Sequence, residues 1–269
     1  MTKLDNQNYL RSQQYKDSSN LNARVSLHDR FSTNPQGWFA WIIEQIDLPP
    51  DCRILELGCG TGQLWHAILQ QRGMKHLPEG WQVTLSDFSE GMLAQARETL
   101  ADYAGFDFQV IDAQSIPFED AHFDAVIANH MLYHVPDRPR ALREIRRVLK
   151  PGGRLYATTI GEKHMQELLS LTDRFDPSGR TEQMKMGGEF SLESGLAQLQ
   201  QVFHTVRMER YPDSLHVTEA APLVSYLMSS AGFEAEDRKT EFAAFIERIF
   251  EENGGVLDIT KDSGMFTAF

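Results

Sequence analysis

Cysteine is scarce in this sequence, and long apolar runs are absent. The 269 residues include two cysteines, Cys52 and Cys59, which are too few for a disulfide framework and form no paired CxxC motifs of the kind that hold structural zinc. No stretch approaches the roughly 20 apolar residues that a membrane-spanning helix needs, and the polar first 20 residues lack the apolar segment of a signal peptide. We therefore expect a cytoplasmic protein without a membrane partner.

Positive charge is also in short supply. The chain has 26 Lys and Arg against 38 Asp and Glu, a formal net charge of −12, so a phosphate backbone would be repelled at long range. The basic stripe of Arg143, Arg146, Arg147 and Lys150 follows one face of an expected helix and is typical of a solvated surface. Nucleic acid is therefore not an expected partner, and 41% hydrophobic content is ordinary for a globular chain.

The middle of the chain alternates between strand-like and helix-like segments. Short apolar or β-branched runs occur at 53–57, 83–86, 108–111, 123–128 and 154–160. Amphipathic stretches at 64–71, 89–103 and 138–149 separate them, with Ser89 as the N-cap of the second. This alternation predicts a parallel sheet built from βαβ units, an α/β fold.

The flanking segments are expected to complete one domain, 1–269. Residues 1–48 form a polar N-terminal lid followed by a helix that starts at Asn34 and Pro35, and 49–160 form the ligand-binding core. The block 161–203 looks like a helical cap inserted over the sheet edge, with one helix over 162–175, a loop over 176–189 and another helix capped by Ser191. In the last segment, 204–269, we expect strands at 206–211, 256–259 and 265–269 and helices at 219–230 and 238–253.

A glycine-rich turn carries the strongest chemical signal. Glu56, Gly58, Gly60 and Gly62 stand where a strand ends and a helix begins, a place where backbone without Cβ atoms lets a ligand approach closely. A dinucleotide site would have its third glycine at position 63, which is Gln63 here, and a carboxylate at position 56 would oppose a pyrophosphate. The turn favours a cofactor without phosphates, although incidental glycines in a tight turn remain the alternative.

The run ILELGCGTGQ, residues 54–63, resembles the first motif of the class I S-adenosylmethionine-dependent methyltransferases. Residues 85–89, 111–113 and 147–153 are similar to later motifs of the same family, and the sequence around Tyr133 resembles its small-molecule branch, which includes quinone methyltransferases. The resemblance covers about residues 49–160. It implies a doubly wound, Rossmann-like sheet of seven mostly parallel strands, S-adenosylmethionine as cofactor and S-adenosylhomocysteine as product.

The resemblance also assigns residues to the cofactor. It implies that Asp87 holds the ribose hydroxyls, that Phe88 borders the adenine, and that Asp112 accepts from the adenine amino group while the backbone of Ala113 meets the ring. The full expected set is Glu56, Gly58, Cys59, Gly60, Gly62, Asp87, Phe88, Asp112, Ala113 and Asn129.

Several of these residues have structural alternatives. Asp87 is also suited to cap the helix near Ser89, and Asp112 to close a strand-end turn, while Cys59 fits as a small residue rather than a nucleophile. His130 is the candidate catalytic base, with pocket lining as its alternative. His134, four residues later, is expected to be structural, because two histidines without a third ligand do not make a metal site.

The expected function is in-line methyl transfer to an N, O, S or C atom of a small-molecule acceptor, helped mainly by alignment and exclusion of water. Where the acceptor must lose a proton, His130 or His28 is the candidate base. Acceptor choice is expected in residues 1–33 and 161–203. A binding scaffold without turnover, a nicotinamide-dependent oxidoreductase and an enzyme catalysing another rearrangement stay open as alternatives, as do the acceptor and the oligomeric state.

Overall fold

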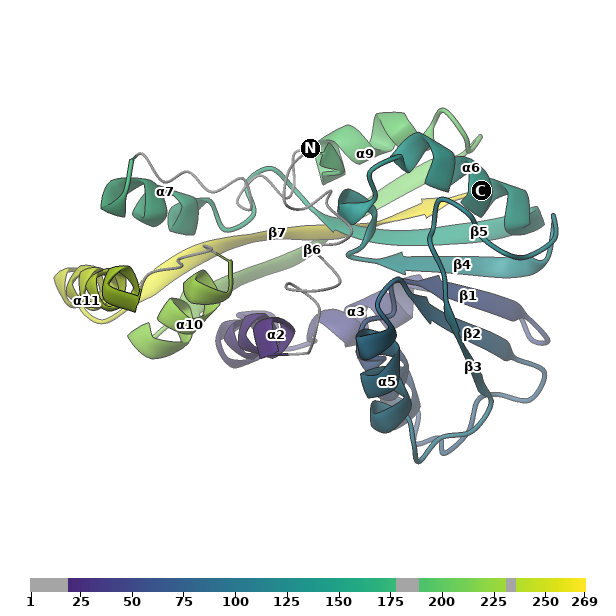
Figure 1. Ribbon diagram of the computed structural model, residues 1–269, viewed down its shortest axis with the longest axis horizontal. Coiled ribbons are helices and arrows are strands. Elements are labelled where there is room, and N and C mark those ends of the chain that lie inside the picture. Colours follow the sequence, from purple (N-terminus) through teal and green to yellow (C-terminus); the bar gives the residue numbers. More distant parts are fainter. Residues whose placement is uncertain (1–18, 178–188, 231–235) are drawn as a thin grey trace.

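A seven-stranded sheet forms the centre of the protein (Figure 1). The structure is a computed structural model that describes residues 19–177, 189–230 and 236–269. The strands lie in the order β3-β2-β1-β4-β5-β7-β6, and β7 runs antiparallel to both of its neighbours while the others are parallel. The predicted fold is confirmed. Most of the expected lid, 1–18, and of the expected loop, 178–188, lies outside the described residues.

The strands of the core follow the predicted apolar runs, except that β5 starts at Leu149 rather than at position 154, and the strands depart further from the prediction near the C-terminus. Their bounds are β1 Arg53–Leu57, β2 Gln82–Asp87, β3 Phe106–Val110, β4 Phe123–Asn129, β5 Leu149–Ile160, β6 Val206–Val217 and β7 Leu257–Ala268. The prediction of two closing strands was wrong: β7 is continuous because it pairs with β6 over its whole length, from Leu257 opposite Val217 to Ala268 opposite Val206. For the same reason β6 is longer than predicted.

Helices cover both faces of the sheet. On one face lie α3 Trp38–Gln45, α4 Gln63–Gln71 and α5 Glu90–Thr99, and on the other lie α6 Arg138–Val148 and α9 Leu192–Leu199 (Figure 1). Alternate residues of β1 point to opposite faces of the sheet: Ile54 packs with α3, α4 and α5, and Leu55 and Leu57 pack with α6 and α9. The site therefore rests on strands buried from both sides, which is typical of parallel sheets.

The first helix before the sheet begins later than predicted. The Asn34-Pro35 pair forms a turn, in which Asn34 Oδ1 accepts from the backbone N–H of Gln36 at 2.9 Å, and α3 starts after Gly37. The backbone N–H of Asn34 is held at 3.0 Å by Asp213 on β6, a contact from a distant part of the chain that the local sequence does not announce. Gly37 has a φ of +74°, which sets the direction of the helix.

A helical extension surrounds the outer halves of the long strands β6 and β7. It consists of α2 Ser19–Phe31, α7 Gln166–Phe175, α10 Ala220–Ser230 and α11 Glu236–Glu252 (Figure 1). Their apolar side chains share a third core, which includes Leu27, Leu168, Leu223 and Ile246. The described part of the expected lid, α2, is thus a packed helix. Among residues 25–31 of this helix, the part whose burial the structure describes, Leu27 and Phe31 are buried.

The second helix of the expected cap insertion, α9, packs against one face of the sheet. The buried residues Leu192 and Leu199 of α9 share the core that includes Leu55 and Phe266, so α9 covers a face rather than an edge. Ser191 caps it as predicted, accepting from the backbone N–H of Ser194 at 3.0 Å, while Ser194 Oγ accepts from the N–H of Ser191 at 2.9 Å. This reciprocal pair satisfies two otherwise unpaired donors.

Replacing Ser191 with Ala removes the cap and is expected to lower the free energy of unfolding by about 1 kcal/mol. Urea denaturation monitored by circular dichroism measures the change. Ser225→Ala is the matched control, because Ser225 lies in mid-helix on the exposed side of α10, where its hydroxyl donates to the Ala221 carbonyl at 3.0 Å. Equal effects from both substitutions would contradict a specific contribution of the cap.

Candidate functional site

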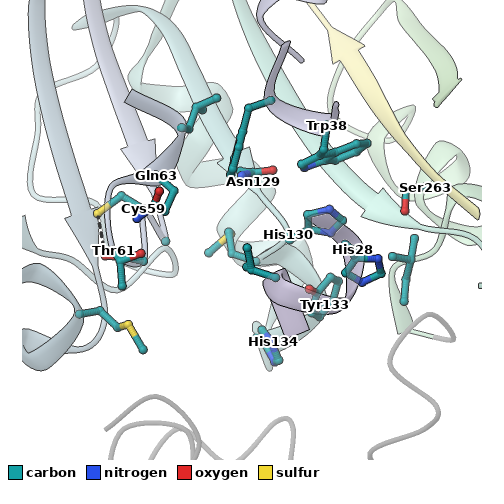
Figure 2. Close-up of a pocket in the computed structure, with 18 of the residues that line it drawn as sticks. His28, Trp38, Cys59, Thr61, Gln63, Asn129, His130, Tyr133, His134 and Ser263 are labelled. Atoms are coloured by element: carbon teal, nitrogen blue, oxygen red, sulfur yellow. Dashed lines mark hydrogen bonds between the residues drawn. The ribbon is translucent and has the colours of Figure 1, made fainter. Parts of the chain in front are cut away.

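A cavity of about 740 Å³ opens at the carboxyl ends of the parallel strands. It lies at the point where the strand order reverses between β1 and β4, the usual ligand position in a doubly wound sheet. In Figure 2, Cys59, Thr61 and Gln63 lie on one side and His28 and Ser263 on the other, with His130 between them. The predicted site residues that line it are Gly58, Cys59, Gly60, Asp87, Phe88, Asp112, Ala113, Asn129 and His130. Glu56 and Gly62 are not among the lining residues.

The glycine loop, residues 58–62, has left-handed backbone at Gly58, Gly60 and Gly62, with φ values of +66°, +55° and +77°. A Cβ at Gly58 would lie 2.7 Å from the Cβ of Met131. Packing against the protein itself therefore excludes a side chain at Gly58. Gly60 lines the cavity, and its conformation is one that a β-branched residue rarely adopts.

Asp87, at the end of β2, joins the glycine loop to the start of α5. Its Oδ2 accepts from the backbone N–H of Gly60 at 3.0 Å, and its Oδ1 accepts from the N–H of Ser89 at 2.8 Å. Burial raises the pKa of this carboxyl, and the backbone N–H donors oppose the rise. Ser89 itself caps α5, accepting from the Met92 N–H. Asp87 thus has a structural role in addition to a place in the cavity wall.

Asp112 and Cys59 also fit their structural alternatives. Asp112 Oδ1 accepts from the backbone N–H of Gln114 at 2.9 Å, which closes a turn after β3, and the residue still lines the cavity. Cys59 is buried, and desolvation together with the nearby carboxyls of Glu56 and Asp87 raises the pKa of its thiol well above the ordinary value. A thiol held protonated is a poor nucleophile.

Glu56 lies beneath the glycine loop rather than in the cavity wall. As the alternate neighbour of Ile54, its side chain enters the face covered by α4, where Oε2 accepts from Trp65 Nε1 at 2.8 Å. The residue is 1% exposed. Burial raises its pKa to about 8, the Trp65 hydrogen bond opposes this rise, and Asp87 adds to it. Glu56 is therefore mostly protonated at neutral pH.

His130 follows β4 and lies in the centre of the cavity wall, 5.2 Å from Trp38 between ring centroids. It has a φ of +52°, an uncommon conformation for a residue with a side chain, and its backbone N–H donates to Thr158 Oγ1 at 3.0 Å. Burial, with a further effect of Lys261, lowers the pKa of its imidazole to about 4. The ring is therefore neutral at pH 7, and one of its nitrogens can accept a hydrogen bond.

His134 ends the short helix η2 Leu132–His134, and its ring packs 4.5 Å from that of Tyr133. Among the described ranges 19–177, 189–230 and 236–269, no group of three or more His, Cys, Asp or Glu side chains is arranged to hold a metal ion. Within the same ranges, no helix is both long enough and apolar enough to span a bilayer.

Sequence reasoning did not single out a further set of lining residues from α2, the turn before α7, α10 and β7, although Val25, Asp29 and His164 fall in the blocks 1–33 and 161–203 expected to choose the acceptor. They are Val25, Asp29, Tyr226, His164, Lys261 and Ser263. The signal is weak: in β7, Lys261 and Ser263 fall on the same face as buried Ile259 and Met265. That alternation predicts inward-facing polar residues only once 257–268 is taken as one strand. Of the expected cap block 161–203, His164 lines the cavity.

The core of the chain matches known methyltransferases. A protein-family model described as a methyltransferase domain matches residues 55–157. The ubiquinone/menaquinone biosynthesis C-methyltransferase UbiE of Desulfotalea psychrophila is 39% identical over 119 residues, 44% of this chain and 46% of the relative. Prosolanapyrone synthase of Alternaria solani is 40% identical over 110 residues, 39% of this chain and 4% of that protein. The chain thus spans less than half the length of these relatives.

Solved structures share the fold over a longer part of the chain. The YcgJ protein of Bacillus subtilis superimposes with a TM-score of 0.58 at 17% identity, covering 86% of this chain and 96% of its own. A Haemonchus contortus phosphoethanolamine N-methyltransferase 2, solved with S-adenosylhomocysteine, has a TM-score of 0.58 at 19% identity and covers 100% of this chain and 60% of its own. The family match identifies residues 55–157 as a methyltransferase domain, and the solved structures together with the strand order show that the fold of this domain is shared over most of the chain.

Proposed function

We propose that this protein transfers a methyl group from S-adenosylmethionine to a small-molecule acceptor. The observation that carries the proposal is the continuity of the cavity: one space of about 740 Å³ is bordered both by the predicted cofactor residues and by residues outside the matched domain. Two reactants held side by side in one cavity meet the main requirement of a bimolecular transfer. The matched relative UbiE, described as a C-methyltransferase, supports the same reaction class.

The residues present fit this cofactor. Gly60, Asp87, Asp112 and Ala113 line the cavity from the ends of three adjacent strands, and each offers backbone or carboxylate groups suited to a nucleoside bearing an amino acid. When bound, S-adenosylmethionine supplies an electrophilic methyl group on a positively charged sulfur. The chain would hold the nucleoside between Asp87 and Asp112 and keep the glycine loop close to its amino-acid part.

The chain's remaining task is to orient the acceptor and exclude water. His130 lies where the cofactor side of the cavity meets residues of the extension, as Figure 2 shows. Because its imidazole is neutral at pH 7, it is suited to accept a hydrogen bond from an acceptor hydroxyl or amine. With a pKa near 4 it is a weak base. We therefore assign His130 mainly to positioning the acceptor. It would remove a proton only from an acceptor that is acidic enough to lose one to a weak base.

Calorimetric titration with S-adenosylhomocysteine, S-adenosylmethionine and NAD tests the proposal. We expect the first two to bind and NAD to show no heat of binding. Incubation with S-adenosylmethionine and a panel of phenols, amines, thiols and carboxylic acids should then release S-adenosylhomocysteine with some of them. NAD binding at the expense of the other two would overturn the proposed cofactor, and binding without turnover across a broad panel would favour a scaffold.

Asp87→Ala is expected to weaken S-adenosylhomocysteine binding roughly 10- to 50-fold, about 1.4–2.3 kcal/mol, because it removes a carboxylate from the wall and releases the Gly60 N–H. Calorimetry measures the change. Asp120→Ala is the control, since Asp120 is exposed and pairs with Arg147 at 2.9 Å, outside the cavity lining. An unchanged affinity in a folded Asp87→Ala protein would remove Asp87 from the cofactor site.

A further inference from the structure

The part of the cavity beyond His130 has a lining distinct from that of the cofactor side. We call it the outer chamber and define it by His28, Trp38, Tyr133, His164, Tyr226, Lys261 and Ser263. Aromatic contacts connect its walls: the His28 ring lies 5.8 Å from Tyr226 and 6.1 Å from His164, centroid to centroid. Apart from Tyr133, these residues lie outside the matched domain, 55–157. The relatives' shared sequence therefore does not account for the chamber.

The ammonium group of Lys261 is buried next to these aromatic residues. The Lys261 side chain is 7% exposed, and its Nζ lies 2.6 Å from Asp213 Oδ2 and 5.2 Å from the centroid of the Tyr211 ring. Among the residues that the structure describes, Asp213 is the one hydrogen-bond acceptor that Lys261 contacts. Because an ammonium carries three donors, two of them remain for a ligand in the chamber that Lys261 lines.

Asp213 is held too firmly to be a ligand group itself. Its carboxylate accepts from Ser32 Oγ at 2.6 Å and from the backbone N–H groups of Asn34 at 3.0 Å and Ser214 at 2.8 Å. Its side chain is 0% exposed, and burial is outweighed by these donors and Lys261, which lower its pKa. Asp213 thus fixes Lys261 against the turn between α2 and α3, which also lines the cavity.

The histidine beside Lys261 adds an uncharged polar group. His164 Nδ1 is buried, and within the described residues it has no hydrogen-bond partner. Burial lowers the pKa of this imidazole to about 3, with smaller effects of His130 and Lys261 in the same direction, while a hydrogen bond with the Asp262 backbone opposes the shift. The ring is therefore neutral, and a ligand that offers a matching group would satisfy a buried atom that is otherwise costly.

On this basis we propose that the outer chamber binds a flat acceptor with a hydroxyl or carbonyl oxygen at its buried end, seated on Lys261 and His164, and with no cationic group. The proposal rests on the proposed function, since it names the acceptor class of the same cavity. The aromatic walls supply the surface for the flat body, and Lys261 supplies a positively charged hydrogen-bond donor for the oxygen.

The charges of the chamber select this class over two others. A fixed cation would lie beside Lys261. Of the lining carboxylates, Asp87 and Asp112 lie on the cofactor side, and Asp29 is exposed, so a charge pair with it contributes little. A permanent anion would pay a desolvation cost that Lys261, already paired with Asp213, only partly offsets. A polar oxygen on a neutral molecule avoids both costs.

Three probes of similar shape test the proposal on the full chain saturated with S-adenosylhomocysteine: 2-naphthol, 2-methylnaphthalene and 2-naphthylmethylammonium. We expect 2-naphthol to bind at least about tenfold more tightly than either of the others, measured by calorimetry. The double substitution Lys261→Met with Asp213→Asn, which removes both charges together and leaves neither buried alone, should reduce this preference to within about threefold.

The matched control is Lys150→Met with Asp124→Asn, which removes a pair of 2.7 Å at the opposite, amino-terminal edge of the sheet and should keep the preference. His164→Leu, which leaves the ion pair of Lys261 and Asp213 in place, should lower the preference for 2-naphthol severalfold. This variant tests the proposal if the double variant does not fold. Failure of S-adenosylhomocysteine to bind would overturn the proposed function. With that ligand bound, an equal affinity for the three probes, tighter binding of the ammonium, or an unchanged preference in the Lys261 or His164 variants would overturn the chamber assignment alone.

Discussion

Gly60→Val is expected to lower the affinity for S-adenosylhomocysteine at least about 100-fold, or roughly 2.7 kcal/mol. Gly60 has a φ of +55° and lines the cavity. A β-branched side chain disfavours that conformation and would also occupy space on the ligand side of the loop. In addition, a shift of the Gly60 N–H would break its 3.0 Å hydrogen bond to Asp87. Calorimetric titration of the purified variant measures the loss.

Gly152→Val is the control for this experiment. Gly152 also has a positive φ, +78°, but no further atom lies within 4 Å of where its Cβ would be. The residue is exposed in the irregular first part of β5, between the pairs that Leu149 and Arg154 make with β4. The Gly152→Val substitution therefore imposes comparable backbone strain far from the cavity and should leave the affinity for S-adenosylhomocysteine unchanged. A folded Gly60→Val protein with wild-type affinity, or an equal loss in Gly152→Val, would refute the placement of the cofactor at the glycine loop.

The sequence predicts the central sheet well because the signal there is local. The run 53–57 matches β1 residue for residue, since each strand of a parallel sheet is buried on both faces and reads as a short apolar segment. The turn that follows β1 and the acidic residues Asp87 and Asp112 come together in one cavity wall as expected. Their positions follow from the rule that parallel strands present their carboxyl ends at one edge.

Features that depend on distant contacts were not predictable in this way. The start of α3 is set by Asp213, about 180 positions along the chain, and the continuity of β7 is set by its pairing with β6. Lys261 looks like a surface residue in the sequence and is buried because Asp213 neutralises it. The outer chamber, and with it the proposed acceptor class, therefore became visible only from the structure.

The side of the strand on which Glu56 lies could be worked out only with the covering helices in place. The sequence suggested a carboxylate facing the cofactor, whereas the structure buries it against Trp65 on α4. Its pKa, ordinarily 4.5, rises to about 8, so the folded protein holds a proton there that the unfolded chain releases near pH 4.5. The stabilising effect of this proton is complete below about pH 4.5 and is lost as the pH rises through about 8.

Glu56→Gln should therefore change the pH dependence of stability more than stability at acidic pH. A glutamine keeps an oxygen that can accept from Trp65 Nε1 but cannot ionise. Near pH 5 we expect the variant and the wild type to have similar free energies of unfolding. Near pH 9 the variant should be more stable by at least about 2 kcal/mol, with an upper bound of roughly 5 kcal/mol if the whole pKa rise is expressed. Urea denaturation at about pH 5, 7 and 9 measures the difference.

Glu98→Gln on the exposed side of α5 provides the comparison, because an exposed glutamate should give nearly parallel pH curves for variant and wild type. Asp87, whose pKa is also raised by burial, adds to the pKa rise of Glu56, so the difference between wild type and Glu56→Gln includes the interaction between the two carboxyls. Parallel curves for Glu56→Gln would mean that Glu56 is ionised in the folded protein. In that case a nearby positive charge or further hydrogen-bond donors would have to stabilise the buried, ionised carboxylate.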